Sequence, residues 1–164
     1  MTSFEDGVQQ IHSWPDETGL KGLAQDLVEG IVLEAEIFVP NQQRSILWDT
    51  GVGLNTIPIL YGWAARRRAG GIAEGLWIVT EDRLVVFECR LKSLRGKIKI
   101  KRRIGAWSRN SIHPRRVPVR RLWRKGELAA VTFEDPEGNY FEMMPLVNSD
   151  AAKEVVRLLC DVPP

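Results

Sequence analysis

The 164-residue sequence has few cysteines, few histidines and no long apolar run. Its two cysteines, Cys89 and Cys160, are too few for a disulfide-stabilised scaffold or a four-cysteine zinc site. The two histidines, His12 and His113, lie far apart and belong to no metal-binding motif. No apolar segment approaches the roughly 20 residues that a membrane-spanning helix needs. We therefore expect no metal, no other cofactor and no transmembrane segment.

The N-terminus lacks the features of a secretory signal. Glu5 and Asp6 make it acidic, whereas a signal peptide begins with basic residues. Both cysteines stand in apolar runs, which is typical of small buried side chains in a reducing compartment. We expect a cytoplasmic protein, located at the inner membrane face if its basic surface binds lipid.

Charge is strongly segregated along the chain, although the net charge is only +2. Residues 1–42 hold eight acids and one base, and residues 126–164 hold eight acids and two bases. Residues 43–89 hold five of each, whereas residues 90–125 hold fifteen Lys or Arg and no acid. A basic block of this kind is either a binding surface or a face that the acidic segments neutralise after folding.

The apolar periodicity predicts helices near the N-terminus. Phe4, Val8, Ile11 and Trp14 have the spacing of a short helix that Pro15 ends. Residues 20–31 follow the 3–4 spacing of an amphipathic helix that ends at Gly30.

From Ile31 the apolar residues alternate with a period of two, which predicts strands, and the helical spacing occurs again near the C-terminus. Asn148, Ser149 or Asp150 caps a final helix with one apolar stripe. Strands are predicted at residues 31–39, 76–80, 83–91, 97–103, 116–124, 128–134 and 140–146.

Three segments resemble bacterial pleckstrin-homology-like (PH-like) domains. Leu76–Phe87 is similar to the second hairpin of that family, and Trp107–Ile112 to the segment that leads into its second sheet. Residues 133–138, with the following strand and final helix, resemble its C-terminal half. The resemblance implies an α+β fold: a PH-like barrel or sandwich of about seven antiparallel strands with a capping C-terminal helix. The barrel would span residues 31–162, with a partly helical insert at 41–75 and a helical arm at 1–30.

The resemblance also implies a binding module rather than an enzyme. Eukaryotic relatives often bind phosphoinositides through the loop between their first two strands, which corresponds to the 41–75 insert here. Arg66, Arg67 and Arg68 do not match the usual basic motif in that loop. Bacterial members share the fold without a common ligand site, and self-association is common among them, so a homo-oligomer stays open.

The basic block supplies the candidate binding site. Within residues 97–103, Ile98 and Ile100 occupy one strand face and the cations occupy the other. The predicted site consists of Lys97, Lys99, Lys101, Arg103, Arg116, Arg120, Arg124, Trp107 and Trp123.

Several ligands fit such a surface. The first candidates are anionic lipid headgroups or an acidic protein partner, because each cation near an anionic surface contributes about 1 kcal/mol to the binding free energy. Nucleic acid comes second, because arginines and lysines bind phosphates while tryptophans stack on bases. Alternatively, both tryptophans belong to the core and the cations pair with Glu34, Glu36 and the acidic C-terminal strands.

One motif points to an enzyme. Asp49-Thr50-Gly51 is similar to the catalytic tripeptide of dimeric, retroviral-type aspartic proteases. Trp48 and Gly53 depart from the usual pattern, and residues 55–69 favour a helix where a protease has strands. We keep this hypothesis as a distant alternative to non-catalytic binding.

Overall fold

The structure is a computed structural model. It describes residues 10–13, 19–40, 74–92, 97–119, 128–146 and 149–161. Most of the predicted insert, including Asp49 and the helix expected near residue 60, lies outside these residues.

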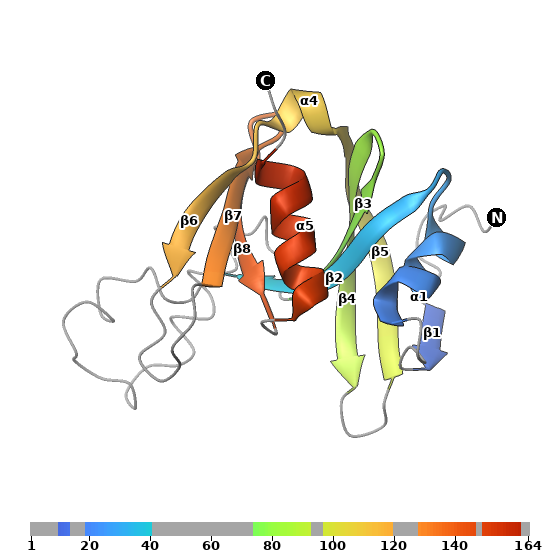
Figure 1. Ribbon diagram of the computed structural model, residues 1–164. Coiled ribbons are helices and arrows are strands. Elements are labelled where there is room, and N and C mark those ends of the chain that lie inside the picture. The colour runs from blue at the N-terminus through green and yellow to red at the C-terminus, as the bar shows by residue number, and fades with distance from the viewer. Residues whose placement is uncertain are drawn as a thin grey trace.

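Within the described residues, eight strands form one antiparallel sheet in the order β1-β5-β4-β3-β2-β8-β7-β6. The sheet bends so strongly that helix α5 stands between its two halves, while helix α1 covers the other side of the β3–β5 half (Figure 1). The strands are β1 Gln10–Ser13, β2 Val32–Pro40, β3 Gly75–Thr80, β4 Arg83–Lys92, β5 Lys97–Ser108, β6 Arg115–Val119, β7 Leu128–Glu134 and β8 Tyr140–Pro145. The helices are α1 Gly19–Leu27, α4 Arg109–Ile112 and α5 Asp150–Cys160.

The α+β class, the seven antiparallel strands between residues 31 and 146 and the final helix are confirmed. Of the strand predicted at 116–124, residues 120–124 lie outside the described residues. The helix expected around residues 4–14 is wrong over Gln10–Ser13, which form β1 and pair with Lys97–Ile100. An isolated helix of so few residues is marginal in water, whereas pairing with β5 satisfies the backbone groups of β1. Strand β5 also continues to Ser108, five residues beyond its predicted end.

The two larger hydrophobic cores of the described residues lie on opposite faces of the sheet, and a small third cluster surrounds Ala130 and Met144. Strand β3 divides them, because all six of its residues are buried and alternate side chains enter opposite cores. Trp77 and Val79 enter the core beneath α5, and Leu76 and Ile78 enter the core beneath α1.

Helix α5 closes the first core as its sequence predicts. The Ser149 hydroxyl accepts a hydrogen bond of 3.0 Å from the Ala152 N–H, which caps the helix. Ala152, Val155, Val156 and Leu159 form the predicted apolar stripe, and all four are buried.

A chain of aromatic rings joins the two halves of the sheet. Trp77 of β3 stacks on Phe38 at 4.4 Å and meets Phe133 of β7 edge-on at 5.6 Å. Phe133 in turn stacks on Phe141 of β8 at 4.7 Å. The Phe133 ring therefore connects the β7–β8 half to the central strand.

We predict that Phe133→Ala lowers the free energy of unfolding by about 3–5 kcal/mol, because it leaves a cavity among the rings of Trp77, Trp107 and Phe141. Chemical denaturation measures the effect. Tyr140→Ala is the control, since Tyr140 is 42% exposed, and its effect should stay within about 0.5 kcal/mol. Equal losses in the two variants would contradict the bridging role of Phe133.

The turn between β7 and β8 is built around the Asp135 carboxylate. That carboxylate accepts hydrogen bonds from the backbone N–H groups of Glu137 and Asn139, at 3.0 and 2.8 Å. The Asn139 side-chain amide donates a third bond at 2.9 Å. Gly138 has a φ of +86°, a conformation that glycine adopts without strain. Burial alone would raise the pKa of Asp135, but the hydrogen bonds from Asn139, Glu137 and Gly138 lower it below 3.8.

The lowered pKa links this turn to acid stability. The stabilisation is complete above pH 3.8 and is lost as the pH falls through the folded-state pKa. We predict that Asp135→Asn costs about 1–3 kcal/mol near neutral pH. The difference in the free energy of unfolding between wild type and variant should become smaller at acid pH. Denaturation at several pH values measures it, and a difference that does not change with pH would refute the assignment.

Candidate cationic binding surface

The β4–β5 hairpin extends beyond the central strand. Gly75, the first residue of β3, pairs with Glu88, so Cys89–Lys92 of β4 continue past that pairing. They pair with Lys97–Ile100 of β5, which in turn pair with β1. On the α5 side, β4 carries Leu84 and Val86 in the core and then turns polar at Glu88.

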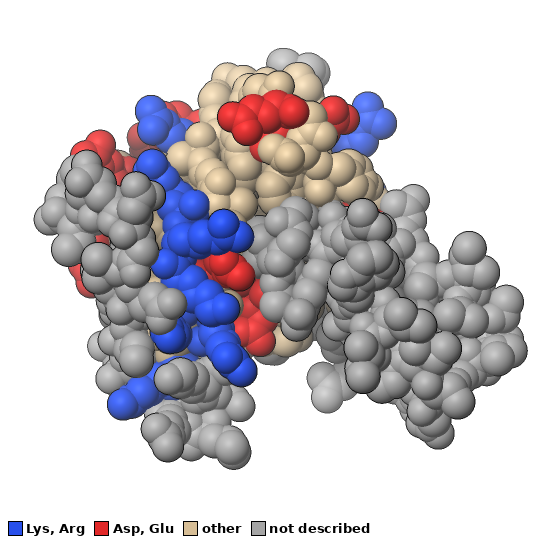
Figure 2. Space-filling model, turned by 180° about the vertical axis from the view of Figure 1, so that it is seen from behind, with Lys and Arg blue, Asp and Glu red and all other residues tan. Residues whose placement is uncertain are grey.

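Cations gather on this extension. Figure 2 shows Lys and Arg side chains in a stripe along one side of the molecule, with acidic residues beside part of it. Glu88 is the one acidic residue in β4 and β5. We use the name cationic surface for Arg90, Lys97, Lys99, Lys101 and Arg102.

Two bulges decide which way these cations face. Strand β5 has one extra residue at Lys101 and another at Ile104, because Ile100 pairs with Cys89 while Arg102 pairs with Glu88. Directly opposed residues of an antiparallel pair share a face. Arg102 therefore shares the face of Glu88.

Arg103 faces the other way from Arg102. It lies opposite Phe87, whose side chain belongs to the core beneath α1. The expected single row of Lys97, Lys99, Lys101 and Arg103 is thus interrupted, since strict alternation does not survive a bulge.

Glu88 neutralises one part of the surface. Its carboxylate lies 2.8 Å from Arg102 Nε and 4.0 Å from Lys101 Nζ. Only 18% of the Glu88 side chain is exposed, whereas 64% of the Arg102 side chain is. One carboxylate is therefore shared by two cations.

The Arg90–Lys99 pair is not neutralised in this way. The two residues lie directly opposite each other on β4 and β5. No carboxylate of the described residues lies within 4.0 Å of Arg90, Lys97 or Lys99. Like charges directly opposite each other destabilise a sheet by up to about 1 kcal/mol per pair.

Of the acids expected to neutralise the block, Glu34 and Glu36 have other contacts, whereas an acid near the C-terminus pairs with a cation of the block. Glu36 accepts a hydrogen bond of 2.7 Å from the Ser149 hydroxyl, and Glu34 accepts one from the Ala35 N–H. Asp161, near the C-terminus, pairs with Arg116 at 2.7 Å. In the described part of the chain, internal neutralisation of the basic block is therefore partial.

Trp107 does not present an open aromatic face. Its ring packs against Phe133 at 5.2 Å and Phe141 at 5.3 Å, on the edge of the core beneath α5. A Cβ on Gly105 would come within 2.2 Å of the Trp107 ring, so the indole lies directly over this glycine. This matches the alternative in which Trp107 is a core residue.

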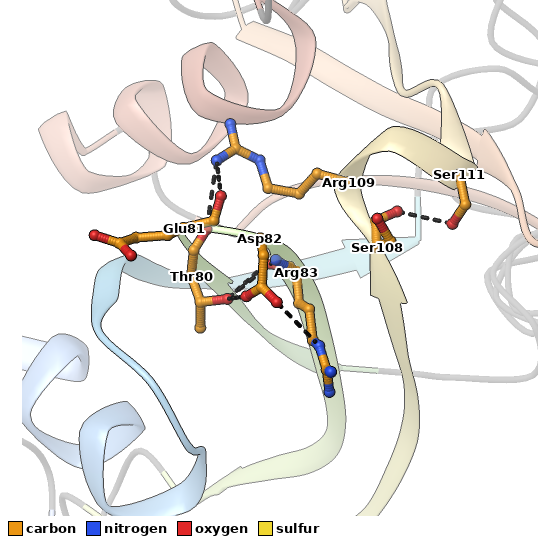
Figure 3. Close-up of polar contacts among 7 residues, drawn as sticks. All are labelled: Thr80, Glu81, Asp82, Arg83, Ser108, Arg109 and Ser111. Atoms are coloured by element: carbon orange, nitrogen blue, oxygen red, sulfur yellow. Dashed lines mark hydrogen bonds and ion pairs between the residues drawn. The ribbon is translucent and has the colours of Figure 1, made fainter.

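Arg109, another cation of the basic block, holds the fold together (Figure 3). Its guanidinium donates to the Glu81 carbonyl at 3.1 Å, to the Thr80 carbonyl at 3.4 Å, and to the Leu158 carbonyl of α5. A cation at the C-terminal end of a helix also interacts favourably with the helix dipole. Arg109 therefore ties the β3–β4 turn to the end of α5.

We predict that Arg109→Ala lowers the free energy of unfolding by about 2–4 kcal/mol, because it leaves three carbonyls without this donor. Arg109→Lys should recover only part of the loss, since an ammonium cannot reproduce the planar fork. Arg83→Ala is the control in the same turn. Its ion pair with Asp82 is exposed and should contribute less than about 0.5 kcal/mol. An Arg109→Ala protein as stable as Arg83→Ala would contradict the assignment.

The remaining predicted site residues lie elsewhere. Arg116 is on β6 and binds Asp161, so it is separate from the β4–β5 surface. Arg120, Trp123 and Arg124 lie outside the described residues. Arg90 is a surface member that the predicted site omits. The alternation of Phe87, Cys89 and Leu91 already places Arg90 on the polar face of its strand.

Other site chemistry has little support in the described residues. They contain no cluster of three or more His, Cys, Asp or Glu that could hold a metal ion. Burial raises the pKa of the Cys89 thiol to about 12 and that of Cys160 to about 11, which disfavours the reactive thiolate. No helix in the described part of the chain has the length and apolar character needed to cross a membrane.

Comparison with family models, curated proteins and solved structures finds no match for this chain.

Proposed function

We propose that this protein is a non-catalytic binding module that recognises an acidic ligand through the cationic surface of β4 and β5. Lipid headgroups and an acidic protein segment share the chemistry this surface would bind. The observation that carries the proposal is the opposed Arg90–Lys99 pair, which has no carboxylate of the described residues within 4.0 Å.

We further propose that residues 31–162 form a PH-like domain. Seven antiparallel strands, β2 to β8, are followed by one amphipathic helix that packs between the two halves of the bent sheet. This order of elements supports the proposal, as do the Leu76–Phe87 hairpin and the capped C-terminal helix.

The energetics of the pair favour a binding role over a structural one. A residue that serves only the fold should stabilise it, whereas opposed cations repel each other. An anionic ligand would relieve that repulsion. Sites that act on ligands often lower the stability of the free protein in this way.

We predict that Arg90→Gln/Lys99→Gln has opposite effects on stability and binding. The free energy of unfolding should rise by about 0.2–1 kcal/mol because a like-charge pair is removed. Binding to phosphatidylserine-containing vesicles and to polyglutamate should weaken by about 30-fold if each cation contributes about 1 kcal/mol. Co-sedimentation and fluorescence anisotropy measure binding, and it should also weaken as salt is added.

The matched control is Lys153→Gln/Arg157→Gln, which changes the net charge by the same amount on exposed positions of α5. Its affinity for both probes should stay close to that of the wild type. Two results would refute the proposal: equal losses in the two variants, or no binding of the wild type to either probe at low salt.

A further inference from the structure

Part of the outer edge of β5 is not paired in the described structure. Strand β1 pairs with Lys97–Ile100 only, and β4 occupies the other edge of β5 along its whole length. Residues 101–108 therefore have no strand partner on their outer side among the described residues. Arg102, Arg103, Ala106 and Ser108 along this stretch are exposed. An open edge of this kind is a template for another strand.

The opposite end of the sheet is less suited to this role. Strand β6 ends the sheet there and has five residues, one of which is Pro118. Proline has no N–H to donate and is typical of edge strands that do not accept a partner. Residues 101–108 contain no proline.

Two consecutive arginines place cations on both sides of the β5 edge, and the bulge at Lys101 sets which face each of them takes. Arg102 lies on the face of Glu88 and Arg103 on the face of Phe87, so the backbone edge runs between two guanidinium groups. A second copy of this edge would bring like charges together, which disfavours pairing between identical chains. An incoming strand with consecutive acidic residues would instead meet a cation on each face.

We propose that the acidic ligand is an extended segment of a partner protein that adds to β5 as a further strand along residues 101–108. This inference rests on the proposed function and specifies the partner. Main-chain hydrogen bonds hold the added strand. Its adjacent acidic side chains bind Arg103 and the terminal nitrogens of Arg102, whose Nε pairs with Glu88 and whose side chain is 64% exposed. This is the general mode of β-strand addition, in which the backbone supplies affinity and the side chains supply specificity.

The first test uses the blocked peptide Thr-Glu-Val-Glu-Glu-Val-Glu-Thr and a version methylated on its backbone nitrogens. Methylation removes the N–H donors without changing the charge, so the full-length protein should bind the methylated peptide at least about tenfold more weakly. Arg102→Gln/Arg103→Gln should weaken binding of the unmodified peptide by about tenfold or more. Lys153→Gln/Arg157→Gln should leave it unchanged.

The second test measures amide hydrogen exchange with and without the unmodified peptide. Exchange should slow across residues 101–108 and stay unchanged in β6, which is the internal control. Equal binding of the two peptides, or no added protection at residues 101–108, would overturn strand addition. The proposed function would still hold after that result if vesicles or both peptides bind the wild type and bind Arg90→Gln/Lys99→Gln more weakly. Loss of all binding would overturn both proposals.

Discussion

Strand β3 must bury both of its faces, and the other elements are arranged around that requirement. Its alternating side chains enter two separate cores, so one helix has to cover each side of the sheet. Helix α1 covers one side, and α5, held between the two halves of the bent sheet, covers the other (Figure 1). The aromatic chain from Phe38 through Trp77 to Phe133 then fixes one half against the other.

The cationic surface follows from the length of β3. Because this strand starts opposite Glu88, the hairpin of β4 and β5 extends past it and past the core beneath α5. On the α1 side the extension still carries buried Cys89, Ile98 and Ile100. The other face of the extension carries Arg90 and Lys99. The fold thus presents a half-buried strand pair whose polar face is free to carry charge.

The cations of the basic block have separate roles. Arg109 binds backbone carbonyls and holds the β3–β4 turn to α5, and Arg116 binds Asp161. Lys101 and Arg102 share Glu88. Arg90 and Lys99 instead face each other across the strand pair. Fifteen basic residues in one stretch therefore do not make one uniform patch, because local geometry assigns some to the fold and leaves others to a ligand.

The sequence by itself determined the elements whose apolar pattern is regular. Strand β7 matches its predicted range, and the stripe of α5 is buried as expected, because side-chain periodicity directly sets which face meets a core. It also determined that residues 90–125 are basic. The sequence alone did not predict strand β1, because the backbone hydrogen-bonding groups of Gln10–Ser13 are satisfied by β5, almost ninety residues away in the chain. Only the tertiary structure decided which face Arg102 and Arg103 each take, because the bulge at Lys101 depends on pairing with β4. The tertiary structure likewise decided that the Trp107 ring, which lies over Gly105, joins the aromatic cluster. The contacts of Trp107 with Phe133 and Phe141 form only when β5, β7 and β8 come together.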